Sequence, residues 1–325
     1  MSADEFDIIR TLFAPLAASP EARGLIDDVA VLEARGKVIV TTDAIVEGVH
    51  FFPDDPIGTV AMKALRVNLS DLAAKGAICT GALLTLAWPN DRPSHQLAEF
   101  ARGLAEDLTL YEIPLLGGDT TSTSGPLVVS ITAFGASLAQ RVPSRADAKV
   151  GDDVWVSGTI GDGWVGLEAL KAASATRLLR AEFAHAIARY RVPQPRVMNR
   201  IIQDFAAASM DISDGLIQDA AKLAAASQVR LRIVADDVPL SSDTRRWLAR
   251  GGHDALAPLS GGDDYEILFT AASAHRDAIA AAAATLAFGV TRIGAVEAGE
   301  GLVLTDRHGA ELKSAARGYT HKLGS

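Results

Sequence analysis

The sequence predicts a mixed α/β protein of the α+β class that folds as two domains. Its 325 residues correspond to about two domains of the usual size. With 49% hydrophobic and 22% charged residues and 13 prolines, the composition is that of a globular protein, not a disordered or fibrous one. Strand-like and helix-like segments alternate along both halves, without a fixed-period repeat.

The first half shows this alternation clearly. Residues 37–42, KVIVTT, form a β-branched run typical of a strand, and residues 57–76 have the apolar spacing of a helix. Further along the chain we expect a strand at 82–88, a helix at 96–111, a short strand at 113–116 that ends at two glycines, and a strand at 127–138.

A domain connection is expected at residues 140–151, because this stretch contains Pro143, Gly151 and several charged residues without periodicity. We therefore place the domains at residues 1–140 and 150–325. The second half predicts strands at 154–157, 229–234, 265–270 and 291–296, a strand running into Asp211, Ala-rich helices that include residues 177–190, and a helix from Leu216.

The overall charge argues against several partners. Subtracting 40 acidic from 31 basic residues leaves a net charge of −9, which disfavours electrostatic binding to nucleic acid or to an anionic membrane. The single cysteine, Cys79, cannot form an intramolecular disulfide, and the acidic N-terminus lacks the features of a signal peptide. No apolar run is long enough to span a membrane, so we expect a soluble, cytoplasmic protein.

The aspartates carry the functional signal. They stand at predicted strand ends or glycine turns, at Asp27-Asp28, Asp43, Asp119, Asp211 and Asp263-Asp264, and Asp71 lies within a predicted helix. One aspartate beside a glycine is ordinarily a turn residue, and Ser213 or Asp214 ahead of Leu216 is an ordinary helix cap. The collection is different, because loops at strand ends are where such folds place ligand chemistry.

Carboxylates gathered in one site stay ionised when cations lie between them. Ligands that offer only oxygen favour a hard cation such as Mg²⁺, which commonly bridges carboxylates to substrate phosphates. An acidic protein can hold polyphosphate in this way. Asp211 and Asp214 are three residues apart at the start of a helix and can reach a common site, and Thr41 and Thr42 beside Asp43 add further oxygens.

The sequence supports neither of two common nucleotide-binding motifs. A P-loop is excluded because no G-x-x-x-x-G-K-[ST] occurs. Residues 161–166, GDGWVG, match G-x-G-x-x-G, but a dinucleotide fold needs a second strand with an acidic end about 20 residues on. Residues 177–190 predict helix instead, so we interpret these glycines as a tight turn that allows close helix packing.

Three further side chains have a structural and a functional interpretation. His50 stands before two phenylalanines, where it is ordinarily a hydrogen-bonded structural residue but can also contact a substrate ring or phosphate. Tyr319 near the C-terminus is likewise either a packing residue or a contact to the substrate. Arg145, in the predicted domain connection, is by default a solvated charge and alternatively a phosphate contact.

Taken together and in order, these motifs resemble the thiamine-monophosphate kinase family, within the superfamily of aminoimidazole ribonucleotide synthetase. The segments that carry the resemblance are DDVAVL (27–32), VTTDAIVEGVHF (40–51), NLSDLAAKGA (68–77), LLGGDTT (115–121), DISDGL (211–216) and SGGDDYEILFT (260–270). The resemblance implies a two-domain α+β fold and a homodimer. Residues 1–140 would bind ATP and Mg²⁺ and form the dimer, and residues 150–325 would complete the active site.

The resemblance also implies a role for individual positions. Those matching ligands of several Mg²⁺ ions are Asp28, Thr41, Thr42, Asp43, Asp71, Asp119, Asp211 and Asp214. Gly118, Asp119, Arg145 and Ser213 match ATP contacts, and His50, Asp263 and Tyr319 match contacts to thiamine phosphate. The sequence departs from the family at Ile26, where glycine is common, and at Asp263, where glutamate is expected.

The implied activity is the ATP-dependent phosphorylation of thiamine phosphate to thiamine diphosphate, by in-line transfer with Mg²⁺ and without an assigned catalytic base. The alternative enzyme is a related ATP-dependent synthetase that phosphorylates an amide or carboxylate oxygen. A Ca²⁺- or nucleotide-binding module without catalysis, and an acidic protein whose aspartates only form turns, are the remaining hypotheses.

Overall fold

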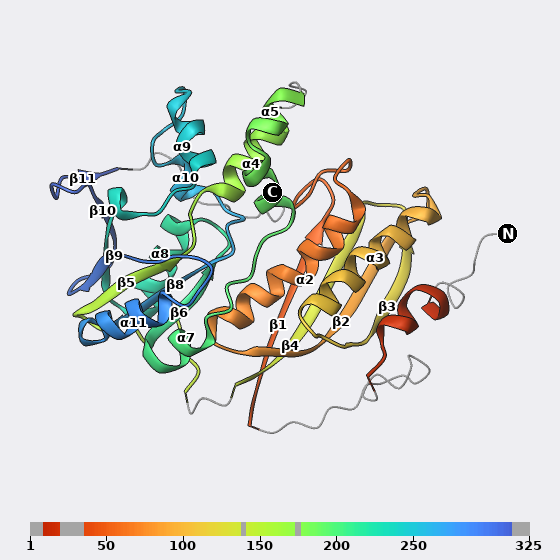
Figure 1. Ribbon diagram of the computed structural model, residues 1–325, viewed down its shortest axis with the longest axis horizontal. Coiled ribbons are helices and arrows are strands. Elements are labelled where there is room, and N and C mark those ends of the chain that lie inside the picture. The colour runs from red at the N-terminus through yellow and green to blue at the C-terminus, as the bar shows by residue number, and fades with distance from the viewer. Residues whose placement is uncertain (1–8, 20–35, 138–140, 173–176, 314–325) are drawn as a thin grey trace. The chain divides into compact units, whose positions relative to one another are not determined.

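The computed structural model of the protein describes residues 9–19, 36–137, 141–172 and 177–313. The chain divides into two compact units (Figure 1). The first contains Met1–Leu72 and Ala77–Leu138, and the second contains Ala73–Gly76 and Ala139–Ser325.

The first unit contains a four-stranded sheet in the order β1-β4-β2-β3. Its elements are η1 (Ile9–Phe13), η2 (Ala14–Leu16), β1 (Lys37–Val46), α2 (Ile57–Ala74), β2 (Ile78–Pro89), α3 (Ser94–Leu110), β3 (Leu115–Thr123) and β4 (Val128–Ser137). Strand β4 pairs antiparallel with both β1 and β2, whereas β2 and β3 are parallel. The parallel pair is possible because α3 carries the chain back between these two strands.

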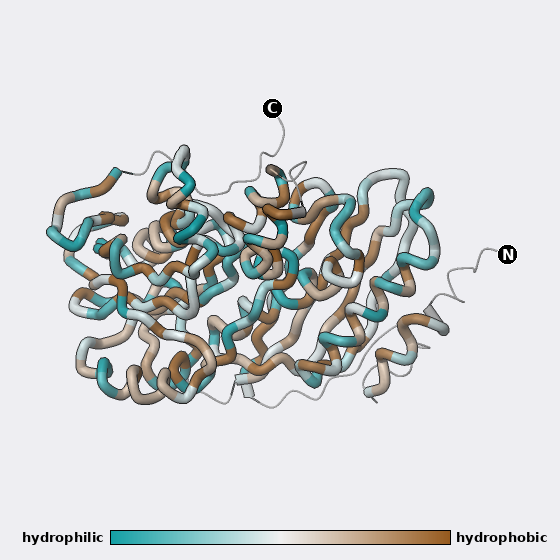
Figure 2. The backbone as a smooth tube through the Cα atoms, turned by 45° about the horizontal axis from the view of Figure 1, so that its top comes forward, coloured by the Kyte–Doolittle hydropathy of each residue, from teal (hydrophilic) through white to brown (hydrophobic). Residues whose placement is uncertain are grey.

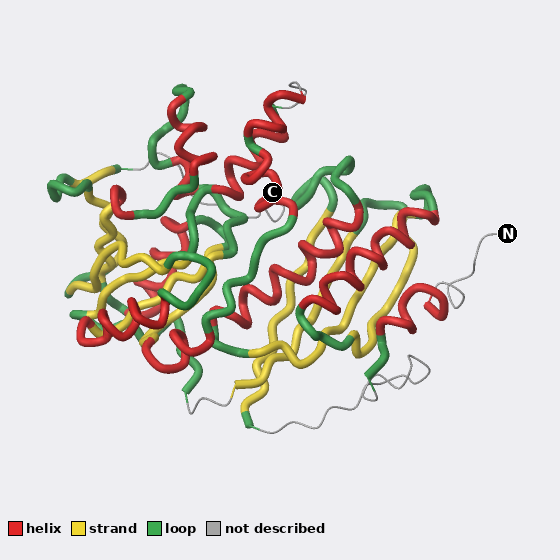
Figure 3. The backbone as a smooth tube through the Cα atoms, viewed as in Figure 1, coloured by secondary structure: helices red, strands yellow, loops and turns green. Residues whose placement is uncertain are grey.

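Helices α2 and α3 cover one face of this sheet (Figures 1 and 3). Their apolar residues, such as Leu65 and Phe100, form one core with Leu84 and Val129 of the strands. Alternation along β1 places Val38 and Val40 on the other face, where they are 49% and 55% exposed. The sheet is therefore buried on its helix-covered face and open on the opposite face.

Two strands of the first unit are longer than predicted. The expected end at Asp43 was wrong, because Asp43 and the three residues after it continue the ladder with β4. The expected end at Gly117 and Gly118 was also wrong, because β3 passes through both glycines and Asp119 lies opposite Thr85 of β2. In both cases pairing with a neighbouring strand outweighs the turn preference of Asp and Gly.

The second unit contains a seven-stranded sheet in the order β11-β10-β7-β9-β5-β8-β6. Its elements are β5 (Asp152–Ser157), α4 (Asp162–Lys171), α5 (Arg177–Glu182), α6 (Ala184–Arg191), α7 (Asn199–Phe205), β6 (Ala206–Ile212), α8 (Leu216–Ser227), β7 (Arg230–Val234), η4 (Ala235–Asp237), α9 (Ser242–Ala249), α10 (Ala257–Ser260), β8 (Glu266–Ala272), η5 (Ser273–His275), α11 (Arg276–Ala283), β9 (Val290–Glu297), β10 (Gly301–Thr305) and β11 (Glu311–Leu312).

Both faces of this second sheet are covered, as the interior strand β8 shows. Leu268 packs in the core that includes α8, whereas Ile267 and Phe269 pack in the core that includes α7 and α11. Neighbouring residues on a strand point to opposite faces, so this apolar run serves both cores. The predicted mixed helix and strand content is confirmed.

The predicted helical character of residues 177–190 is confirmed, although the segment forms two helices, α5 and α6, separated at Phe183. The strand required by a dinucleotide fold therefore does not follow the Gly161–Gly166 motif. Hydrophobic and hydrophilic residues are interspersed along the elements (Figure 2). Among the described residues, no helix is both long and apolar enough to cross a membrane.

Candidate functional site

Oxygen-bearing side chains lie along the helix-covered side of β1. Thr41, Asp43 and Ile45 share one face of this strand because side chains alternate, and Ile45 is buried in the core. The hydroxyl of Thr41 donates a 2.5 Å hydrogen bond to Oδ2 of Asp71 on α2. This part of the first unit brings together three of the residues that were predicted as metal ligands.

Asn68 supports this arrangement from within α2. Its side chain is fully buried, its Oδ1 accepts a 3.0 Å hydrogen bond from the backbone N–H of Asp43, and its Nδ2 donates to the carbonyl of Ala64 at 3.0 Å. The sequence interpretation did not single out Asn68. Its spacing of three residues before Asp71 is the signal that could have found it, because this spacing places both side chains on one helix face.

Thr42 and Asp119 belong to the opposite, open face of the same sheet. The hydroxyl of Thr42 donates to the carbonyl of Ile131 at 3.2 Å and accepts from Thr132. In the strand register, Ala44, Ser130, Thr85 and Asp119 form one row across the sheet. Asp119 is thus three strand spacings, about 14 Å, from β1, and the first unit by itself does not bring it to Asp43.

Gly118 has a structural reason to be glycine. A Cβ at this position would lie 1.8 Å from the carbonyl oxygen of Leu84, so no larger residue fits against β2. The residue is nevertheless exposed, and its backbone is therefore accessible to a ligand. Close packing against β2 therefore explains the glycine at this position.

His50 is held by its own loop. Its Nδ1 accepts a 3.0 Å hydrogen bond from the backbone N–H of Val46, and its carbonyl accepts a 2.9 Å bond from the buried ammonium of Lys63. In the neutral imidazole this leaves the ring proton on Nε2. The loop therefore fixes both the direction and the tautomer of the side chain.

In the second unit, two turns that were predicted as functional lie side by side. The backbone N–H of Asp263 donates a 2.9 Å hydrogen bond to the carbonyl of Ser213, and that of Tyr265 donates a 2.8 Å bond to the carbonyl of Ile212. The structure thus brings a predicted ATP contact, Ser213, next to a predicted thiamine phosphate contact, Asp263. Asp211 lies just before this pair, at the end of the edge strand β6.

Asp219 organises the turn that contains Ser213 and Asp214. Its buried Oδ2 accepts hydrogen bonds of 3.0 and 2.9 Å from the backbone N–H groups of these two residues. Lys222, one turn further along α8, donates to Asp219 at 2.8 Å and also bonds the carboxylate of Asp214. The sequence interpretation missed both residues, although their three-residue spacing on a helix was visible.

The charges of this group are mutually dependent. Burial raises the pKa of Asp219, while the hydrogen bond and charge of Lys222 counteract the rise. Burial lowers the pKa of Lys222, but its bonds to Asp214 and Asp219 outweigh this effect and raise the pKa above its ordinary value. Asp214 therefore faces a cation supplied by the chain itself.

Arg145 is exposed, and its carbonyl accepts a 2.8 Å hydrogen bond from Ser227 at the C-terminal end of α8. Ser213 precedes the N-terminal end of that helix, about 18 Å away for its 12 residues. The second unit does not bring these two residues together. Asp28 and Tyr319 lie outside the described residues.

The donor set of the first unit is compatible with Mg²⁺. Among the residues that the structure describes, no group of three or more His, Cys, Asp or Glu side chains is arranged to hold a metal ion. Thr41, Asp43 and Asp71 offer oxygen atoms only, with two carboxylates. Because Mg²⁺ in phosphate-transferring sites is commonly held by one or two carboxylates together with water and substrate phosphates, this smaller set fits it.

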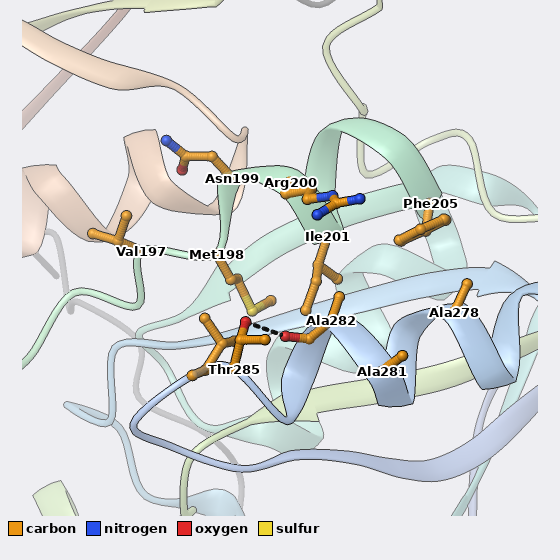
Figure 4. A pocket seen from close by; sticks show the side chains of 11 residues that line it. Val197, Met198, Asn199, Arg200, Ile201, Phe205, Ala278, Ala281, Ala282 and Thr285 are labelled. Atoms are coloured by element: carbon orange, nitrogen blue, oxygen red, sulfur yellow. Dashed lines mark hydrogen bonds between the residues drawn. The ribbon is translucent and has the colours of Figure 1, made fainter.

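A cavity of about 470 Å³ in the second unit lies between α7 and α11. Figure 4 shows its lining, which includes Met198, Ile201, Phe205, Ala278 and Ala282. The lining is largely apolar and contains none of the predicted site residues. The oxygen-rich turns, and not this cavity, are therefore the candidate site.

The chain is similar to known families and to curated proteins over most of its length. The family described as "AIR synthase related protein, N-terminal domain" matches residues 26–137, and "AIR synthase related protein, C-terminal domain" matches residues 149–307. The thiamine-monophosphate kinase of Caulobacter vibrioides is 42% identical over 324 residues, which cover 98% of this chain and 90% of the relative.

Solved structures show the same similarity. The thiamine-monophosphate kinase of Stenotrophomonas maltophilia superposes with a TM-score of 0.79 at 36% identity, covering 89% of this chain and 91% of the other. The structure of AaThiL complexed with AMPPCP and TMP also has a TM-score of 0.79, at 31% identity, covering 98% and 97% of the two chains.

Proposed function

The chain belongs to the thiamine-monophosphate kinase family, and on this premise we propose that it transfers the γ-phosphoryl group of ATP to thiamine phosphate, giving thiamine diphosphate and ADP. The observation that carries this proposal is similarity over nearly the whole chain to kinases of this name. A similar protein of solved structure is complexed with AMPPCP and TMP, a pair that corresponds to the two substrates.

The proposed reaction does not require a strong general base from the protein. A phosphate monoester has a second pKa of about 6 and is already largely ionised at neutral pH, so its oxygen can attack the γ-phosphorus without a strong base. The bond from this phosphorus to the β,γ-bridging oxygen breaks, and ADP leaves. We assign no catalytic base, because the main task is to hold two polyanions in line.

The proposed cofactor is Mg²⁺, which when bound neutralises the charge of both phosphate groups. Thr41 and Asp43 share one face of β1, and Asp71 of α2 is bonded to Thr41. All three offer only oxygen atoms as ligands, so they fit this role. The other proposed ligands are Asp28, Thr42, Asp119, Asp211 and Asp214. In this proposal, the carboxylate of Asp214 would give up part of its contact with Lys222 to bind the ion.

The substrate contacts follow from the same premise. We propose that Gly118, Asp119, Arg145 and Ser213 contact ATP. We propose that His50, Asp263 and Tyr319 contact thiamine phosphate. The loop that fixes His50 supports its role, and the hydrogen bond between Asp263 and Ser213 supports theirs, because a fixed group binds a ligand at a smaller entropic cost.

We also propose a homodimer formed through residues 1–140, with residues 150–325 completing the active site. Val38, Val40 and Ile78 are large apolar side chains exposed on the open face of the first sheet, which favours a protein contact there. Asp119 lies on that face, so a contact across it would surround Asp119 with further residues. A cytoplasmic location agrees with the single cysteine.

Product analysis tests the proposed function. The purified protein is incubated with ATP, Mg²⁺ and thiamine phosphate, and in parallel with free thiamine, and the products are separated by chromatography. We expect thiamine diphosphate only from thiamine phosphate. Turnover of ATP with an amide or carboxylate acceptor, and none with thiamine phosphate, would instead identify the related synthetase activity.

A further inference from the structure

Asp264 connects two turns of the second unit. Its side chain is fully buried, and its carboxylate accepts hydrogen bonds of 2.8 Å from the backbone N–H of Gly161 and 3.1 Å from that of Gly163. These glycines form the turn that begins α4. Complete burial, together with the charge of Asp162, raises the pKa of Asp264 well above its ordinary value, while the N–H donors and Arg189 oppose the rise.

Arg189 holds the backbone of the same residue. This arginine of α6 is only 3% exposed, and its Nη2 donates to the carbonyl of Asp264 at 2.7 Å and to Oε1 of Glu266 at 2.9 Å. Glu266 is also bonded to a second cation, Arg196, which donates to its two carboxylate oxygens at 2.7 and 2.6 Å. The backbone and side chain of Asp264 are thus both fixed by buried partners.

The residues on each side of Asp264 have an unusual backbone conformation. Asp263 has φ of +69° and Tyr265 has φ of +51°, in the left-handed region that bulky side chains rarely adopt. Such a conformation persists when the surrounding contacts determine it. Asp264 is the residue between the two, so its bonds to Gly161, Gly163 and Arg189 are placed to maintain this conformation.

The neighbouring turn has its own support. Asp219 holds the backbone N–H groups of Ser213 and Asp214. The two turns meet at the bond from Asp263 N–H to the Ser213 carbonyl. One buried carboxylate therefore holds the loop of Asp263, and a different one holds the turn of Ser213.

We propose that Asp264, together with Arg189, is a positioning residue that sets the backbone of Asp263 for contact with thiamine phosphate, while Asp219 separately sets the turn of Ser213 for contact with ATP. This inference rests on the proposed function of Asp263 and Ser213. It adds that the two substrate contacts are supported by separate buried carboxylates, so they can be impaired one at a time.

The test compares Asp264→Asn and Asp219→Asn in the full-length protein. Asp264→Asn replaces one acceptor oxygen by a donor that faces the Gly161–Gly163 turn, and we expect the KM for thiamine phosphate to rise about tenfold while the KM for ATP stays within about twofold. Asp219→Asn is expected to show the reverse pattern. Arg189→Lys keeps a buried cation but loses the planar guanidinium, and should resemble Asp264→Asn.

Asp153→Asn is the matched control. Asp153 is also a buried carboxylate, bonded by Arg276 at 2.5 and 2.7 Å, but it lies opposite Ala271, five residues along β8 from Glu266 and about 16 Å away. We expect both KM values to be unchanged in this variant. Amide hydrogen exchange at residues 161–163 should accelerate in Asp264→Asn and not in Asp153→Asn.

The outcomes separate the two proposals. If the unchanged protein does not phosphorylate thiamine phosphate, the proposed function fails before any variant is compared. If it does, an equal rise of both KM values in Asp264→Asn, or a loss of thermal stability without a KM change, would overturn the positioning role. If Asp264→Asn does not fold, the same comparison is made with Arg189→Lys, and an unselective effect there overturns the inference.

Discussion

The hydroxyl of Thr41 and the carboxylate of Asp71 form a 2.5 Å hydrogen bond that joins β1 to α2. Asp43, two residues along β1, shares the face of Thr41 and is tied to the same helix through Asn68. Helix α2 therefore places the carboxylate of Asp71 and the backbone of Asp43 at one side of the sheet. In the proposed function, the carboxylates of Asp71 and Asp43 hold Mg²⁺ and the phosphates bound to it.

Asp43→Asn should abolish most activity while the protein stays folded. The backbone N–H bond to Asn68 is retained, but the side chain loses the charge that attracts a cation, so we expect kcat to fall by about 10²-fold or more. Turnover is measured at saturating Mg²⁺ and compared with Asp54→Asn, an exposed carboxylate outside the proposed site. Near-normal turnover of Asp43→Asn would remove it from the proposed ligands.

Arg145→Ala should raise the KM for ATP more than the KM for thiamine phosphate, by about tenfold, because a charged hydrogen bond to phosphate is lost. The steady-state KM values of both substrates are measured, with Arg180→Ala as the control for an exposed cation. An unchanged KM for ATP would exclude Arg145 from the ATP contacts. That result would agree with its anchoring beside Ser227, away from Ser213.

Asp107→Ala should destabilise the first unit. Asp107 is 1% exposed and accepts hydrogen bonds of 2.6 and 2.7 Å from Arg66, so its removal leaves a buried guanidinium without this partner. We expect a loss of about 3–5 kcal/mol in the free energy of unfolding, measured by denaturant titration.

The control for this prediction is Glu182→Ala, which breaks the exposed pair with Arg250. We expect that variant to lose less than about 1 kcal/mol. Equal effects of the two substitutions would contradict the distinction between buried and exposed ion pairs.

Cys79 should resist alkylation in the folded protein. Burial raises the pKa of its thiol from 9.0 to about 11. Between pH 9 and 11 the thiol is ionised in the unfolded chain but still protonated in the folded protein. The free energy of unfolding therefore decreases as the pH rises through this range. Labelling by iodoacetamide at neutral pH should be slow until denaturant is added, and equally fast labelling in both conditions would contradict this.

The sequence was most informative where the local pattern and the tertiary structure agree. The helix at residues 57–76 and the strand at 127–138 were predicted with ends close to those of α2 and β4, because their apolar periodicity matches their burial. The strand ends at Asp43 and Gly117 were wrong, because pairing with β4 and β2 overrides local turn preference. The ends of β1 and β3 depend on pairing with neighbouring strands, which the local sequence does not reveal.

The supporting residues of the site were the hardest to predict. Asp264 was visible within a motif, but its bonds to Gly161 and Gly163 join positions about a hundred residues apart, and no local pattern reveals such a contact. Arg189 was part of a predicted helix, where a lone arginine is ordinarily exposed. Ser213 and Asp263 were both expected in one site, but the hydrogen bond between them was not predicted from the sequence.

The central claim is that this chain phosphorylates thiamine phosphate, and the amounts of ADP and thiamine diphosphate formed from ATP, Mg²⁺ and thiamine phosphate test it most directly. The account predicts one thiamine diphosphate for each ADP, with no ADP above background when free thiamine replaces thiamine phosphate. Formation of ADP without thiamine diphosphate, or no turnover of either substrate, would contradict it.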